Sequence, residues 1–152
     1  MAYHFGIATD GTIFEGVPLT HMGRHAGKTT QSEDMKKKNL PLGMMMSPDF
    51  GAIGIVLAGN FDLDEPTEAQ VESLVWLLSW LKQEYDIPDD GILYHGEVFW
   101  KILTAGFTPT KKEPKSCPGD KFCAKDYIIA RLPEDTEVSC EKNILFGFNI
   151  GR

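Results

Sequence analysis

The alternation of hydrophobic and polar positions predicts a β-hairpin near the start of the chain. Residues 3–8 form a short apolar run, Asp10-Gly11 marks a turn, and residues 12–16 have the pattern of a second strand. A strand, an Asp-Gly pair and another strand form a strong hairpin signal, because these turn residues tolerate the backbone angles that a tight hairpin needs. The next apolar run, at 52–59, is continuous, which is typical of a strand buried on both faces.

A helical pattern follows this apolar run. Thr67 and Gln70 have the spacing of a capping box, in which each residue satisfies a backbone amide of the other. Apolar residues then recur every three or four positions as far as Tyr85. The pattern predicts an amphipathic helix that ends near residues 86–88, where Pro88 disfavours helical backbone before it.

The second half of the chain is predicted to contain short elements separated by loops. The expected elements are a strand at 91–95, a helical turn at 99–105, a helix at 121–132 and a strand at 143–150. Residues 20–50 and 108–116 are expected to be surface loops, because glycine, proline and charged residues interrupt any periodicity there. No internal repeat or linker divides the chain.

Length and charge restrict the classes of function. A chain of 152 residues favours a single domain, 1–152, with a sizeable core. The net charge of −7 argues against a nucleic-acid partner, because binding to phosphates needs a basic face. No apolar run reaches the ~20 residues of a membrane span, so no membrane partner is expected. The first residues also lack the pattern of a secretory signal, which predicts synthesis in the cytoplasm.

Two segments carry residues with metal-binding chemistry. His95 ends the apolar run 91–95, and Cys117 stands in a loop beside proline and glycine. Imidazole nitrogen and thiolate sulfur are donors that Zn²⁺ prefers, but two donors do not complete a zinc site. Cys140 is a weak candidate for a third ligand. A Cys123–Cys140 disulfide and two reduced thiols are both compatible with the odd number of cysteines.

The order of motifs along the chain resembles the zinc-dependent N-acetylmuramoyl-L-alanine amidases, the family that includes phage lysozyme-type amidases and peptidoglycan recognition proteins. The resemblance covers about residues 3–130. It rests on Tyr3-His4-Phe5, Asp10-Gly11-Thr12, Glu15-Gly16, Gly23-Arg24-His25-Ala26, Ile53-Gly54-Ile55, Gly59-Asn60, Pro66-Thr67-Glu68-Ala69-Gln70, the run ending in His95, and Lys115-Ser116-Cys117-Pro118-Gly119.

This resemblance implies an α/β fold with a mixed central β-sheet flanked by helices, and a zinc ion at one end of a groove for peptidoglycan. It implies that His95 and Cys117 are two of three zinc ligands, that Tyr3 and Lys115 are catalytic, and that His25 lines the groove and binds substrate. The implied reaction is hydrolysis of the amide between N-acetylmuramic acid and L-alanine. A zinc ion with three protein ligands activates a bound water, and Tyr3 or Lys115 would stabilise the oxyanion or relay a proton.

The chain departs from the family pattern at its start. Family members provide their first zinc histidine from an opening strand, followed by a helix, and both elements precede the segment that matches Tyr3-His4-Phe5. Three explanations are compatible with this departure: a truncated N-terminus, which could lead to domain-swapped oligomers; a C-terminal extension, 133–152, whose strand at 143–150 fills the missing position; or loss of zinc. The last would leave a non-catalytic peptidoglycan-binding module. In either functional reading the protein is expected to act on the cell wall.

Overall fold

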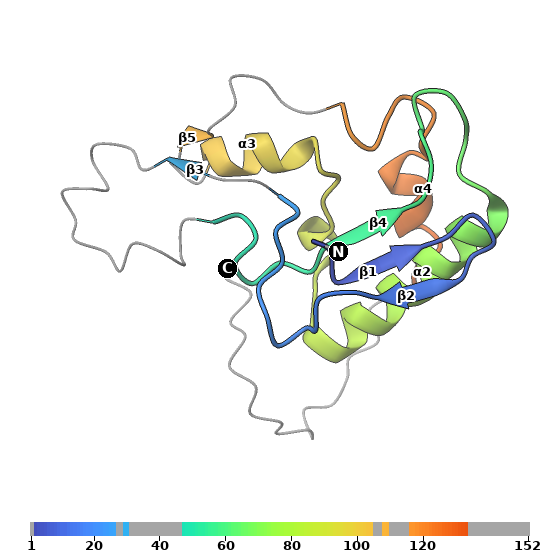
Figure 1. Ribbon diagram of the computed structural model, residues 1–152, viewed down its shortest axis with the longest axis horizontal. Helices are drawn as coiled ribbons and strands as arrows, with labels where there is room; N and C mark the ends of the chain where they lie inside the picture. Colours follow the sequence, from blue (N-terminus) through green and yellow to red (C-terminus); the bar gives the residue numbers. More distant parts are fainter. Residues whose placement is uncertain (1, 27–28, 31–46, 105–107, 110–115, 134–152) are drawn as a thin grey trace.

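A mixed three-stranded sheet forms the centre of the protein (Figure 1). The computed structural model describes residues 2–26, 29–30, 47–104, 108–109 and 116–133. The strands are β1 (Phe5–Ile7), β2 (Ile13–Glu15) and β4 (Ile55–Leu57), in the order β2-β1-β4. Because β1 is antiparallel to β2 and parallel to β4, the predicted mixed sheet is confirmed.

The predicted hairpin joins β1 to β2. Gly6 lies opposite Phe14, and the turn is closed by the Thr12 amide, which donates to the Asp10 side chain at 3.0 Å. Gly11 has a φ of 85°, a value that favours glycine. A Cβ at this position would also lie 2.8 Å from the carbonyl oxygen of Ala69. The turn therefore packs directly on the helix that follows β4.

That helix, α2 (Glu68–Tyr85), begins at the predicted capping box. The Thr67 hydroxyl accepts a hydrogen bond from the Gln70 amide at 3.1 Å, and the Gln70 side chain accepts one from the Thr67 amide at 3.1 Å. The Thr67 hydroxyl also donates to the carbonyl of Thr9 at 2.7 Å, which ties the helix start to the hairpin. Asp86 ends the helix in a left-handed conformation.

The core lies between one face of the sheet and the helices. Phe5 and Ile7 are two residues apart on β1, so both side chains point to the same face. They pack with the buried face of α2 and with Ile128 of α4 (Lys125–Ile129). The α2 residues in this cluster are Val71, Leu74, Leu77 and Leu81. His4 alternates with Phe5 and is buried on the opposite face of the sheet.

A second, smaller sheet lies apart from the first, beside helix α3 (Figure 1). It pairs β3 (Thr29–Thr30) with β5 (Thr108–Pro109) in antiparallel register. Helix α3 (Glu97–Thr104) is longer than the helical turn predicted at 99–105. These short strands fall inside segments that were predicted to be loops.

The predicted strand at 91–95 is wrong. The chain forms a 3₁₀ turn, η1 (Asp89–Gly91), and continues without regular structure to His95. The Tyr94 amide donates to the Glu97 carboxylate at 2.6 Å, and the Glu97 amide donates to the Tyr94 carbonyl at 2.9 Å. These local bonds occupy the Tyr94 groups that a β-ladder would need, so His95 lies in a turn.

The helix predicted at 121–132 is also too long. The Lys121 amide donates to the carbonyl of Phe61 at 2.8 Å, so this residue is held by a loop contact and helix α4 starts only at Lys125. The strand predicted at 143–150 and the Met44–Met46 segment lie outside the described residues. Among the helices that the structure describes, none is long and apolar enough to span a membrane.

We expect Thr67→Ala to lower the free energy of unfolding by about 1 kcal/mol, because the substitution removes an N-cap side chain. Urea denaturation followed by circular dichroism measures the change. Ser79→Ala serves as the control, since the Ser79 hydroxyl bonds only within α2, to Val75. An equal loss of stability in both variants would contradict a special role for the cap.

Candidate active site

The segments that carry His95 and Cys117 meet through a backbone hydrogen bond. The Gly96 amide donates to the carbonyl of Cys117 at 2.9 Å. His95 is half-buried and Cys117 is exposed, and the bond between Cys117 and Pro118 is a cis peptide. The structure therefore brings together the two segments that were predicted to provide zinc ligands.

The carboxylate of Glu97 fixes the turn that contains His95 through two hydrogen bonds. One carboxylate oxygen of Glu97 accepts from Lys125 of α4 at 2.8 Å, while the other accepts from the Tyr94 amide. The Tyr94 hydroxyl donates to the carbonyl of Cys123 at 2.7 Å, and burial raises the pKa of this hydroxyl well above its usual value. Two side chains on either side of His95 thus tie the turn to α4 and to the loop before it.

Tyr3 is half-buried and lies two residues before β1. Burial of Tyr3 raises the pKa of its hydroxyl, and negative charge at Cys117 and at Asp49 raises it further. The phenol is therefore protonated at neutral pH and is available as a hydrogen-bond donor. The predicted catalytic role of Tyr3 is not tested by these contacts and stays a prediction.

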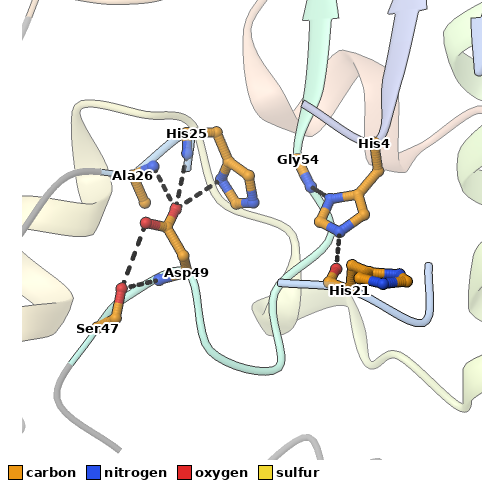
Figure 2. Close-up of polar contacts among 7 residues, drawn as sticks. All are labelled: His4, His21, His25, Ala26, Ser47, Asp49 and Gly54. Atoms are coloured by element: carbon orange, nitrogen blue, oxygen red, sulfur yellow. Dashed lines mark hydrogen bonds and ion pairs between the residues drawn. The ribbon is translucent and has the colours of Figure 1, made fainter. Parts of the chain in front are cut away.

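Asp49 joins the loop that precedes β4 to the loop that contains His25 (Figure 2). One oxygen of its buried carboxylate accepts from the backbone amides of His25 at 2.8 Å and Ala26 at 2.6 Å. The other oxygen accepts from the Ser47 hydroxyl at 3.3 Å. The same carboxylate lies 3.4 Å from Nδ1 of His25. These contacts compensate the burial of a charged group.

The imidazole of His25 is enclosed, with 8% of its side chain exposed. Its ring stacks on Tyr3 with the centroids 5.7 Å apart and the planes inclined by 26°. Atom Nε2 is buried and has no hydrogen-bond partner within the described part of the chain. Burial and neighbouring His4 lower the pKa of the imidazole, and this outweighs the opposing effect of Asp49. The ring is therefore neutral at physiological pH.

Two glycines make room for this ring. A Cβ on Gly54 would lie 2.3 Å from Cδ2 of His25, and a Cβ on Gly23 would lie 2.6 Å from the same atom. Any side chain at either position would displace the imidazole. The Gly23-Arg24-His25-Ala26 and Ile53-Gly54-Ile55 motifs therefore fit together in space, because each provides a glycine where the His25 ring needs it.

His4 is held in the sheet by both of its ring nitrogens. Its Nδ1 accepts from the Gly54 amide at 3.0 Å, and its Nε2 lies 3.0 Å from the carbonyl oxygen of His21 (Figure 2). These bonds assign the proton to Nε2 and leave no ring nitrogen for a metal. His4 therefore has a structural role.

The described residues do not provide a complete zinc site. In this part of the chain, no three His, Cys, Asp or Glu side chains are grouped so that they could hold a metal ion. His95 and Cys117 are donors of the type that zinc prefers, but a zinc site needs at least three protein ligands. Lys115 and the candidate third ligand Cys140 lie outside the described residues, so their predicted roles stay predictions.

Sequence reasoning did not identify Asp49 as part of the site. A signal was present, because Ser47-Pro48-Asp49 combines residues that bond to nearby backbone amides in loops. Here the amides come from a segment more than twenty residues away, His25 and Ala26. No sequence spacing indicates such a contact.

The chain belongs to the N-acetylmuramoyl-L-alanine amidase family, whose model matches residues 1–120. The family predicted from the motifs is thus confirmed. Members of this family are generally zinc-dependent. No curated protein matches the chain.

Solved amidase structures have the same fold. LysC, an N-acetylmuramoyl-L-alanine amidase from Clostridium intestinale URNW, is 25% identical with a TM-score of 0.56, over 86% of this chain and 63% of that one. The endolysin amidase LysCS from the same organism is also 25% identical, with a TM-score of 0.56, over 86% of this chain and 62% of that one. A selenomethionine derivative of AmpD is 23% identical with a TM-score of 0.57, over 86% of this chain and 59% of that one, and shows the fold alone. The chain thus spans less than two thirds of the length of each.

We expect the protein to lose stability on mild acidification through His25. The pKa of this imidazole is lowered on folding, so the unfolded state binds more protons once pH falls below the unfolded value of about 6.5. The stabilisation is complete above that value and is lost as pH falls through the folded pKa. Urea unfolding between pH 8 and about pH 5 measures the effect.

His25→Phe removes the titrating group and should flatten this dependence. His21→Gln, which removes an exposed imidazole, is the matched control and should keep the wild-type slope. If His25→Phe shows the same dependence on pH as the wild type, another group is responsible.

Proposed function

We propose that this protein is a peptidoglycan hydrolase that cleaves the amide between N-acetylmuramic acid and the L-alanine of the stem peptide. The observation that supports the proposal is the Gly96–Cys117 backbone hydrogen bond, which joins the segments that carry His95 and Cys117. Membership of the amidase family and the amidase fold support the same reaction.

The hydrolysis is proposed to use the family's metal. His95 and Cys117 would hold zinc together with a third ligand that the described residues do not provide. When bound, zinc activates water and polarises a carbonyl. We derive the remaining roles from the side chains of the chain itself.

Tyr3 is the best-placed donor in the described part of the site. Because its pKa is raised, its hydroxyl keeps its proton at neutral pH and would donate a hydrogen bond to the developing oxyanion. Lys115 would share this task or deliver a proton to the departing amine. His25 was predicted to bind substrate, and this role stays a prediction. Its side chain is largely enclosed by the surrounding residues.

A non-catalytic peptidoglycan-binding module is the second candidate. The observation that favours it is that the described residues group no three metal-binding side chains. A binding module would be retained on purified sacculi in the presence of a chelator and would release no stem peptides. In both cases we propose that the protein acts on the cell wall.

We expect Cys117→Ser to abolish release of stem peptides from sacculi, because a serine hydroxyl is a poor zinc ligand. Folding should be preserved, since Cys117 is exposed and its structural hydrogen bond is made by its backbone carbonyl. Chromatographic analysis of the products and elemental analysis of zinc in both proteins measure the two effects.

Cys123→Ser is the matched control and should keep wild-type activity and zinc content, because the contact of Cys123 with Tyr94 is made by its carbonyl. Full activity of Cys117→Ser would contradict the proposal. A zinc-free, inactive wild-type protein that still binds sacculi would establish the second candidate.

A further inference from the structure

We infer that Asp49 and His25 act together as a buried support that positions the ring of Tyr3, the residue proposed above as hydrogen-bond donor to the oxyanion. The inference rests on the proposed hydrolase function and assigns Asp49 a role in it. In this arrangement Asp49 and His25 are positioning residues, and neither meets the substrate.

The first step of the argument is the fixation of the loop. A single oxygen of Asp49 accepts both the His25 and Ala26 amides, so the backbone carrying the imidazole is tied to the loop before β4. Charge-assisted bonds of this kind are about twice as strong as neutral ones. The position of His25 is thus determined by the sheet, because β4 begins shortly after Asp49.

The second step is the orientation of the ring. The Asp49 carboxylate lies 3.4 Å from Nδ1 of His25, which favours the tautomer with the proton on Nδ1. The groups that face the imidazole are Asp49, His4, Tyr3 and the backbone of Ala52. The backbones of Gly23 and Gly54 pack against the same edge of the ring, at Cδ2.

The third step connects this ring to the site. Tyr3, the proposed donor, stacks on the imidazole with the ring centroids 5.7 Å apart. Nε2 of His25 is buried and has no hydrogen-bond partner among the residues that the structure describes, so this ring nitrogen is enclosed. The contact through which His25 acts on the proposed donor is therefore the stacking of its ring on Tyr3.

Four variants distinguish whether His25 supports Tyr3 or contacts the substrate directly. If the ring only supports Tyr3, His25→Phe keeps the stacking surface and retains kcat within about threefold, whereas His25→Ala lowers kcat about tenfold or more with little change in KM. Asp49→Ala should resemble His25→Ala. Asp49→Asn keeps an oxygen acceptor for the two amides and should restore most of the activity.

Asp10→Asn is the matched control, because Asp10 also accepts a backbone amide in a loop, at Thr12, on an exposed turn. It should keep the wild-type kcat. The substrate for all variants is a soluble muropeptide, so that kcat and KM are obtained separately. The zinc content of each protein is measured in parallel.

The geometry is tested independently of activity by nuclear magnetic resonance. Nuclear Overhauser contacts between the rings of Tyr3 and His25, and the nitrogen signals of His25, should show the stacked ring with its proton on Nδ1. Asp49→Ala should weaken these contacts, and Asp49→Asn should keep them. Unchanged contacts in Asp49→Ala would overturn the inference, whether or not the protein is a hydrolase.

The kinetic outcomes are equally decisive. An equal loss in His25→Phe and His25→Ala, expressed in KM, would overturn the support role in favour of a direct substrate contact. A wild-type protein that hydrolyses no muropeptide would refute the proposed function only, and the magnetic resonance result would then decide the inference alone.

Discussion

The alternation of side chains along β1 between the two faces of the sheet is the constraint on which the rest of the structure depends. Successive side chains of a strand point to opposite faces, so Phe5 and Ile7 enter the core while His4 is buried on the other face. Tyr3, directly before the strand, stacks on His25. The free energy that fixes β1 comes from the apolar core, roughly 1.5–3 kcal/mol for each large side chain that is fully buried. The same burial fixes the position of the tyrosine.

The sequence predicted the parts of the fold that local chemistry determines. The Asp10-Gly11 turn and the Thr67–Gln70 capping box involve residues close together in the chain, and both were confirmed. The strand expected at 91–95 failed because the Glu97 carboxylate captures the Tyr94 amide. An apolar run alone does not show whether its amides will bond to a neighbouring strand or to a nearby side chain.

The candidate site was only partly predictable for a related reason. His95, Cys117 and Tyr3 could be found from their order in the family motifs, and the Gly96–Cys117 hydrogen bond joins the segments of the first two. Asp49 could not, because its partners are amides, which every residue possesses. A buried carboxylate needs hydrogen-bond partners. When these partners are backbone amides, the residue types that provide them do not reveal the contact.

The site is assembled from two halves that are fixed by separate sets of hydrogen bonds. Asp49 holds the half that contains His25, and Glu97 holds the turn that contains His95 by bonding to Tyr94 and Lys125. Tyr3 lies two residues before β1 and stacks on the first half. Loosening the Asp49 half should therefore move Tyr3 without altering the hydrogen bond between Gly96 and Cys117. Because the two halves do not share anchoring residues, substitutions in one can change the position of the donor while the His95–Cys117 pair stays in place.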